Sequence, residues 1–196
     1  MSLGLPAVVT SRPAWAGDRL ANEAIVIEGE RVRPAHRKQF LPQEDGWFEA
    51  EWFRGDDTGF RPITVGGLSI GILLCTELMF NEHARGYGRS GVDVIVVPRS
   101  TGLARHPWLV AGAMAAIVSG SYVISSNRVG DGPHGPCFGG VGMAFAPDGG
   151  LIAETSAMKP LAVIEVDIER TRAQKVKYPC YVSEAARRHP PAADPD

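Results

Sequence analysis

Two apolar runs of strand length, separated by a helix-length stretch, most strongly constrain the fold. The runs cover residues 68–74 and 92–97, and residues 77–90 lie between them. Strands buried on both faces are apolar throughout and belong to parallel sheets, which are usually connected through helices. The pattern therefore predicts a βαβ-like unit whose two strands lie inside a covered sheet.

The rest of the chain continues the alternation of strands and helices. Apolar patterns and turn residues predict strands at 6–10, 22–27, 31–33, 122–126 and 162–166, a turn at 28–30, a hairpin around 147–150, and helices at 108–119 and 168–175. Residues 110–117 are apolar nearly all round the predicted helix, so we expect this helix to be sandwiched or to lie at a subunit contact.

Length and composition favour one globular domain. With 196 residues, of which 44% are hydrophobic, the chain is long enough to bury a core, and we place the domain at 1–184 with a disordered tail at 185–196. The 20 Lys and Arg residues nearly balance the 22 Asp and Glu residues, which argues against a nucleic-acid partner. The apolar runs are too short for a membrane span and no secretory leader is evident, so we expect a cytoplasmic protein.

Cys75 stands where the first apolar run ends and the predicted helix begins. A strand tip that turns into a helix can present a nucleophile, and the N–H groups of a helix start favour a thiolate. The simpler alternative is that Cys75 is a small buried hydrophobe, as most buried cysteines are. A redox-sensing thiol is a third, weaker reading, because no resolving partner lies nearby in the sequence.

The other cysteines and the histidines do not suggest a metal or a disulfide framework. Cys137 and Cys180 are widely spaced from Cys75 and from each other, and we interpret both as structural or incidental. His134 and Cys137 are the one near pair of metal-ligand type. A metal site needs more ligands at a recognisable spacing, so we expect no metal and no cofactor.

Several segments occur in an order that is more specific than any one of them. Residues 71–82 read Gly-Ile-Leu-Leu-Cys-Thr-Glu-Leu-Met-Phe-Asn-Glu, and residues 36–42 read His-Arg-Lys-Gln-Phe-Leu-Pro. The further segments are 47–56, 91–98, 125–130, 138–140 and 147–149. Together they resemble the nitrilase superfamily of carbon–nitrogen hydrolases over residues 5–170. The first segment is similar to the family's nucleophile motif and the second to the motif that carries its lysine.

The resemblance implies an α/β fold, a four-layer α-β-β-α sandwich of the nitrilase type that here lacks the first strands and helices. It also implies a homo-oligomer in which two sandwiches pack through the helices beside the nucleophile and the region 108–119. Loss of the first elements is expected to strengthen self-association or to lower solubility.

The resemblance also implies a mechanism for a small-molecule amide or nitrile, of which we prefer the amide. Cys75 would attack the carbon to form a thioester, Lys38 and the Thr76 N–H would face the oxyanion, and Glu49 would orient the lysine. The expected oxyanion and substrate contacts are Thr76, Glu77, Ser100, Asn127 and Arg128. Taken singly, Lys38 and Glu49 are more simply read as solvated charges, and only their joint spacing favours the catalytic role.

The departures from the family pattern leave a second function open. The family's general-base glutamate precedes the lysine segment by a longer distance than this sequence offers, and neither Glu23 nor Glu28 stands at its position. Thr76-Glu77 replaces an aromatic-Asp pair, and Gly142 replaces a serine. The alternative to an amidase-like hydrolase is therefore a catalytically inactive binding or scaffolding module with the same fold.

Overall fold

The centre of the molecule is a six-stranded sheet with the order β13-β12-β9-β8-β7-β6. The computed structural model describes residues 4–131 and 136–184. The strands are β6 (Ile63–Val65), β7 (Leu68–Ile72), β8 (Val94–Val97), β9 (Tyr122–Ser125), β12 (Met143–Phe145) and β13 (Leu151–Glu154). Strands β7, β8 and β9 are parallel, and the flanking pairs are antiparallel. The predicted βαβ unit and the hairpin at 147–150 are both confirmed.

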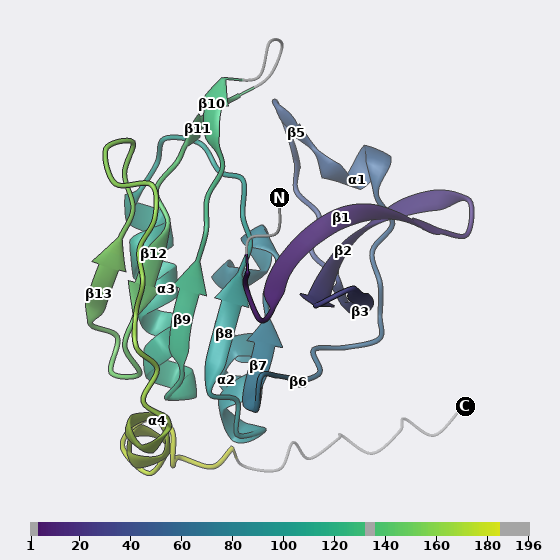
Figure 1. Ribbon diagram of the computed structural model, residues 1–196. Helices are drawn as coiled ribbons and strands as arrows, with labels where there is room; N and C mark the ends of the chain where they lie inside the picture. The colour runs from purple at the N-terminus through teal and green to yellow at the C-terminus, as the bar shows by residue number, and fades with distance from the viewer. Residues whose placement is uncertain (1–3, 132–135, 185–196) are drawn as a thin grey trace, which may run out of the picture.

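Two helices, α2 (Asn81–Arg89) and α3 (His106–Ser119), cover one face of this sheet (Figure 1). The helices approach each other closely, because a Cβ at Gly88 would lie 2.4 Å from the backbone oxygen of Ser119. Gly112 of α3 likewise has no Cβ, and this leaves room for the ring of Phe145, which a Cβ there would meet at 2.4 Å. The buried side of α3 consists of small residues, so the helix packs tightly on one side while Val110 and Met114 stay exposed on the other.

A second sheet packs on the opposite face. It consists of β1 (Val8–Ala16), β2 (Arg19–Glu28) and β3 (Arg31–Arg37) in an antiparallel arrangement. Apolar residues of β2 meet those of β6 and β7 in one buried cluster, so the two sheets pack face to face. The described residues thus form three consecutive layers, α-β-β, of the expected sandwich.

The short elements gather near the end of the molecule toward which β7, β8 and β9 point (Figure 1). They are β4 (Gln43–Glu44), β5 (Trp47–Phe48), α1 (Glu49–Trp52), β10 (Val129–Asp131) and β11 (Cys137–Gly139). The β4-β5 hairpin contacts the β10-β11 hairpin, since the rings of Trp47 and Phe138 lie 5.8 Å apart in an edge-on arrangement. At the other end lies α4 (Ile168–Lys175), capped by the Asp167 carboxylate, which accepts from the Glu169 and Arg170 amides.

Two predicted elements differ in the structure. Residues 162–166 are extended and alternate in burial, with Ile164 and Val166 packed on the central sheet, but no neighbouring strand pairs with them. The predicted helix at 77–90 is broken in two, a 3-10 helix η1 (Cys75–Met79) and α2. Phe80 separates them with a non-helical backbone, and its ring stacks on Phe40 with centroids 4.1 Å apart.

Two further predictions concern membrane-spanning helices and the C-terminal tail. Within the described part of the chain, no helix is both long enough and apolar enough to cross a membrane. The predicted disordered tail at 185–196 lies outside the described residues.

Candidate active site

Cys75 occupies a strained backbone position directly after β7. The parallel ladder continues beyond the strand, with the Leu73 amide donating to Val96 O at 3.1 Å and the Cys75 amide donating to Pro98 O at 3.0 Å. At Cys75 the chain turns sharply, with φ = 52°, into η1. It has the one positive φ among the described non-glycine residues, and the left-handed region costs about 1–2 kcal/mol for a residue with a Cβ. Strain of this kind is concentrated at functional sites.

Lys38 and Glu49 form an ion pair, of which Glu49 lines the same cavities as Cys75 and Lys38 lines neither. Lys38 follows β3, its amide donates to Asn22 O at 2.9 Å, and its side chain is fully buried. The ammonium donates to Oε2 of Glu49, the first residue of α1, whose side chain is about a quarter exposed. A buried ammonium requires a partner of opposite charge, and Glu49 provides it. The structure therefore brings together the two charged residues that the sequence placed in the site.

Glu77 lies beneath the site rather than in it. Its carboxylate is completely buried and accepts from the Leu74 amide and the Gln39 amide, both at 2.7 Å. The ring Nε2 of His36 lies 2.8 Å from the same carboxylate. Glu77 thus ties the turn before Cys75 to the segment that carries Lys38, and it lines neither of the cavities that Cys75 lines.

Cys75 opens onto two adjacent cavities of about 420 and 270 Å³. Both are also lined by Glu49, Trp47 and Ser100. Aromatic side chains from the two hairpins and α1 form much of the wall of the larger cavity, namely Trp47, Phe48, Trp52, Phe53 and Phe138. The Cys75 Sγ lies 3.9 Å from Ser100 O. The arrangement offers a thiol, a carboxylate held by a buried lysine, and aromatic side chains in the wall, which suits a small organic substrate.

Two of the other predicted substrate contacts line the Cys75 cavities, and two do not. Thr76 lines the smaller cavity and Ser100 lines both. Asn127 instead supports the loop, since its Oδ1 accepts from the Thr101 amide at 2.9 Å. The guanidinium of Arg128 lies 4.3 Å over the ring of Phe138. Asn127 and Arg128 therefore position cavity-lining residues and do not line the Cys75 cavities themselves.

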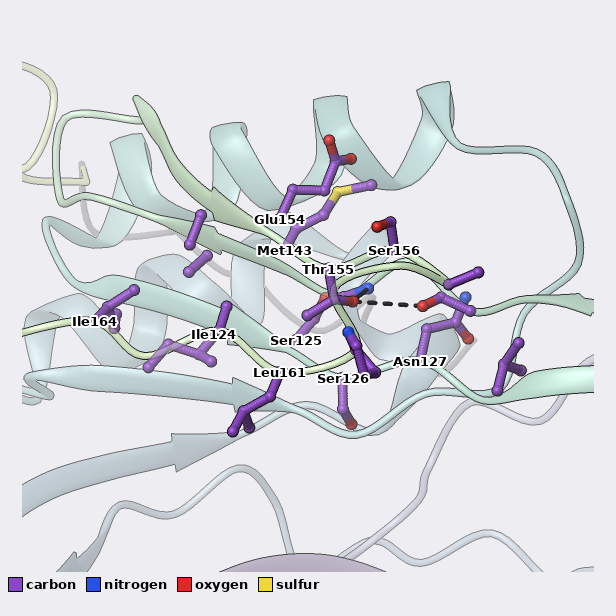
Figure 2. Close-up of a pocket in the computed structure, with 18 residues that line it drawn as sticks. Ile124, Ser125, Ser126, Asn127, Met143, Glu154, Thr155, Ser156, Leu161 and Ile164 are labelled. Atoms are coloured by element: carbon purple, nitrogen blue, oxygen red, sulfur yellow. Dashed lines mark hydrogen bonds between the residues drawn. The ribbon is translucent and has the colours of Figure 1, made fainter.

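Asn127 lines a different cavity, of about 440 Å³, on the sheet face opposite α3 (Figure 2). Figure 2 shows residues of β9 and β12 on one side of it and the segment with Leu161 and Ile164 on the other. Its walls are mainly apolar, and Ser126 is shared with the larger Cys75 cavity.

Arg99 is the functional candidate that the sequence reasoning missed. It lies between Pro98 and Ser100, the residues whose carbonyl oxygens contact Cys75, and it lines the larger cavity. Burial lowers the pKa of Arg99 to about 10, so the side chain stays cationic at neutral pH. The signal was present in the sequence, because Arg99 follows the strand next to the one that ends at Cys75, and the carboxyl ends of parallel strands meet at one edge.

The remaining cysteines differ from Cys75 in their surroundings. A hydrogen bond with Asp131 raises the pKa of the exposed Cys137 thiol. Burial raises the pKa of Cys180, whose Sγ lies 3.3 Å from Ile117 O. Among residues 4–131 and 136–184, no group of three or more His, Cys, Asp or Glu side chains is arranged to bind a metal ion. His134, which stands near Cys137 in the sequence, lies outside the described residues.

Known proteins with similar sequences identify the family of this chain. The carbon-nitrogen hydrolase family matches residues 3–178 of the chain. A nitrilase of Pyrococcus abyssi is 27% identical over 82% of this chain and 59% of its own length, and an (R)-stereoselective amidase of a Pseudomonas species is 25% identical over 82% of this chain and 57% of its own. The chain thus spans less than two thirds of the length of these relatives.

Solved structures show the same fold. A carbon-nitrogen hydrolase of Helicobacter pylori G27 superposes with a TM-score of 0.80 at 23% identity, covering 89% of this chain and 66% of that one. An amidase of a Nesterenkonia species superposes with a TM-score of 0.68 at 20% identity, covering 76% of this chain and 56% of the other.

Proposed function

Because the chain belongs to the carbon-nitrogen hydrolase family, we propose that it hydrolyses the carbon–nitrogen bond of a small amide through a thioester on Cys75. The observation that carries the proposal is the placement of Cys75 at a strained strand end, on two cavities that it shares with Glu49, whose carboxylate holds the buried Lys38. A nucleophile, an adjacent cation and a carboxylate are the groups that amide cleavage by a thiol requires.

The proposed reaction has two steps, formation of a thioester on Cys75 and hydrolysis of that thioester. The Cys75 sulfur bonds to the amide carbon, the carbonyl oxygen becomes an oxyanion, and the positive charge of Lys38 together with nearby N–H donors stabilises it. The carbon–nitrogen bond then breaks, the nitrogen takes the proton that the Cys75 thiol gave up, and ammonia or an amine leaves a thioester on Cys75. Water attacks the thioester carbon, and the products are a carboxylic acid and the regenerated thiol.

One amidase supplies a parallel for covalent chemistry at an active site cysteine. A Glu-to-Gln mutant of the Nesterenkonia amidase carries acrylamide, or the acetamide moiety of fluoroacetamide, on its active site cysteine. A Cys-to-Ala mutant of the same amidase forms a complex with butyramide. Short aliphatic amides are therefore the first substrates to test on this chain.

A second candidate is a binding module without turnover. The described carboxylates that line the Cys75 cavities are Glu44 and Glu49, and Glu49 is bonded to Lys38. The Glu49 carboxylate is therefore not a free base for the Cys75 proton, and Glu44 lines only the smaller cavity. This observation favours a module that binds amides through the same cavity but does not hydrolyse them.

Ammonia release and hydroxamate formation from butyramide separate the two candidates. Hydroxylamine intercepts a thioester as a hydroxamate, so wild type should yield both products and Cys75→Ala should lose at least about 1,000-fold of each. Cys137→Ala is the matched control and should keep the wild-type rates. A folded wild type that binds butyramide by calorimetry, yet releases no ammonia and forms no hydroxamate, would establish the binding module instead.

A further inference from the structure

Among the described residues, Arg99 differs from the other buried charged side chains in facing no side chain of opposite charge in an ion pair. Buried Glu23 is paired with Arg12 and Arg37, and Lys38 is paired with Glu49. Glu77 and His36 face each other. Arg99 is only 7% exposed, and among the described residues it takes part in no ion pair. Burying a charge without a partner is costly, so this position favours an anion, and no described carboxylate pairs with it.

The surroundings of Arg99 hold the guanidinium in place without neutralising it. Its three nitrogens donate to Ser125 Oγ at 3.1 Å, to Thr101 Oγ1 at 2.7 Å and to Val141 O, all neutral acceptors. The ring of Trp108 covers it at 5.1 Å from the centroid. A guanidinium has five N–H donors, so donors remain beyond these three bonds. The side chain is thus preorganised, which lowers the entropic cost of binding an anion.

The position of Arg99 links this charge to the reacting centre. The Cys75 amide donates to the carbonyl of the preceding residue, Pro98, and the Cys75 Sγ contacts the carbonyl of the following residue, Ser100. Arg99 and Cys75 line the same cavity of about 420 Å³, which has room for a short acyl chain. An anion on the far end of such a chain would meet Arg99 while its amide carbon meets Cys75.

We propose that Arg99 binds a carboxylate on the acyl part of the substrate, so that the preferred substrate is the monoamide of a short dicarboxylic acid. This inference rests on the proposed function, because it names the substrate class for the same Cys75 chemistry. A guanidinium binds a carboxylate through two parallel hydrogen bonds, which fixes both orientation and distance. Arg99 would thereby hold the amide carbon at the thiol.

Succinamate and butyramide test the proposal, because they have the same carbon skeleton and differ in a carboxylate at the far end. Wild type should prefer succinamate in kcat/KM, and 4-aminobutyramide, which carries a positive charge there, should be the poorest substrate. Arg99→Met should lower the succinamate-to-butyramide ratio about 10- to 100-fold, the usual range for one charge-assisted contact. Arg105→Met is the control, because Arg105 is exposed, pairs with Glu154 and lines neither Cys75 cavity, and it should keep the ratio.

The other negative charge within reach of Arg99 is a Cys75 thiolate. If Arg99 served only the thiolate, Arg99→Met would slow both substrates alike and would slow alkylation of Cys75, and this result would overturn the proposal. Should Arg99→Met fail to fold, Arg99→Lys keeps the charge but loses the fork geometry, and it should still reduce the preference for succinamate. Equal wild-type rates for succinamate and 4-aminobutyramide would also overturn it.

Calorimetry with Cys75→Ala separates this proposal from the proposed function. If wild type hydrolyses neither amide, the hydrolase proposal fails, but tighter binding of succinamate than of butyramide that is lost in Cys75→Ala/Arg99→Met still supports an anion site at Arg99. Equal binding of the two amides by Cys75→Ala would overturn the anion site whatever the turnover.

Discussion

At the scale of single residues, the backbone strain at Cys75 can be measured. Its φ of 52° costs less in glycine, which has no Cβ, although glycine also gains entropy in the unfolded chain. Cys75→Gly is therefore expected to be more stable than Cys75→Ala by about 0.5–1 kcal/mol in urea unfolding. The same pair of substitutions at Cys180, which has no positive φ, should rank in the opposite order. Equal stabilities at position 75 would mean that the turn carries no strain.

The ion pair between Lys38 and Glu49 gives a second prediction at this scale. Glu49→Gln leaves the fully buried ammonium without a charged partner, so the free energy of unfolding should fall by about 3 kcal/mol. Glu51→Gln is the matched control, since Glu51 is exposed and contacts Gln43 at the surface, and its change should stay within about 0.5 kcal/mol. Chemical denaturation of both variants tests this, and indistinguishable midpoints would show that Lys38 does not depend on Glu49.

At the scale of elements, the crossing of α2 and α3 depends on one glycine. Gly88→Ala would place a Cβ 2.4 Å from the Ser119 backbone oxygen, which forces the helices apart and should cost about 1–3 kcal/mol. A Cβ at Gly86, on the same helix, would have nothing within 4 Å, so Gly86→Ala should stabilise by up to about 1 kcal/mol. Thermal unfolding of the two variants should therefore shift in opposite directions. A stabilised Gly88→Ala would contradict the close approach.

The elements that the sequence predicted well are those whose signals are local. The runs at 68–74 and 92–97 contain β7 and β8, and the predicted helix at 168–175 has the bounds of α4, which begins after the capping residue Asp167. The failures involve partners distant in sequence. The alternation at 162–166 is real, as the packing of Ile164 and Val166 shows, but strand formation needs a neighbouring backbone that periodicity does not reveal.

The residues of the candidate site also differ in how well the sequence predicts them. The spacing of Cys75, Lys38 and Glu49 identified residues that the structure brings together. Glu77 directly follows the nucleophile turn, yet its burial against Leu74, Gln39 and His36 depends on the packing of three separate segments. Arg99 was missed because a charged residue after a strand is usually solvated, and only its packing shows that it is buried.

At the scale of the whole molecule, the outer face of α3 predicts self-association. Val110 and Met114 are 50% and 41% exposed one helical turn apart, on a helix that is otherwise apolar. We expect two copies to pack through this face, because burying apolar surface is the main driving force for association. Val110→Lys/Met114→Lys should reduce the mass found by light scattering, whereas Val32→Lys, an exposed position on β3, should not. A wild type that is monomeric at all concentrations would contradict this expectation.

We infer that this fold presents Cys75 as a reactive nucleophile, and iodoacetamide labelling of each cysteine by peptide mass mapping between about pH 5 and 9 tests this. Cys137 is the more exposed thiol, but Asp131 raises its pKa, and burial raises that of Cys180. We predict that Cys75 reacts first at neutral pH in the folded protein and that Lys38→Met slows it. Cys75 that stays inert until alkaline pH or denaturation, while Cys137 reacts, would contradict the account.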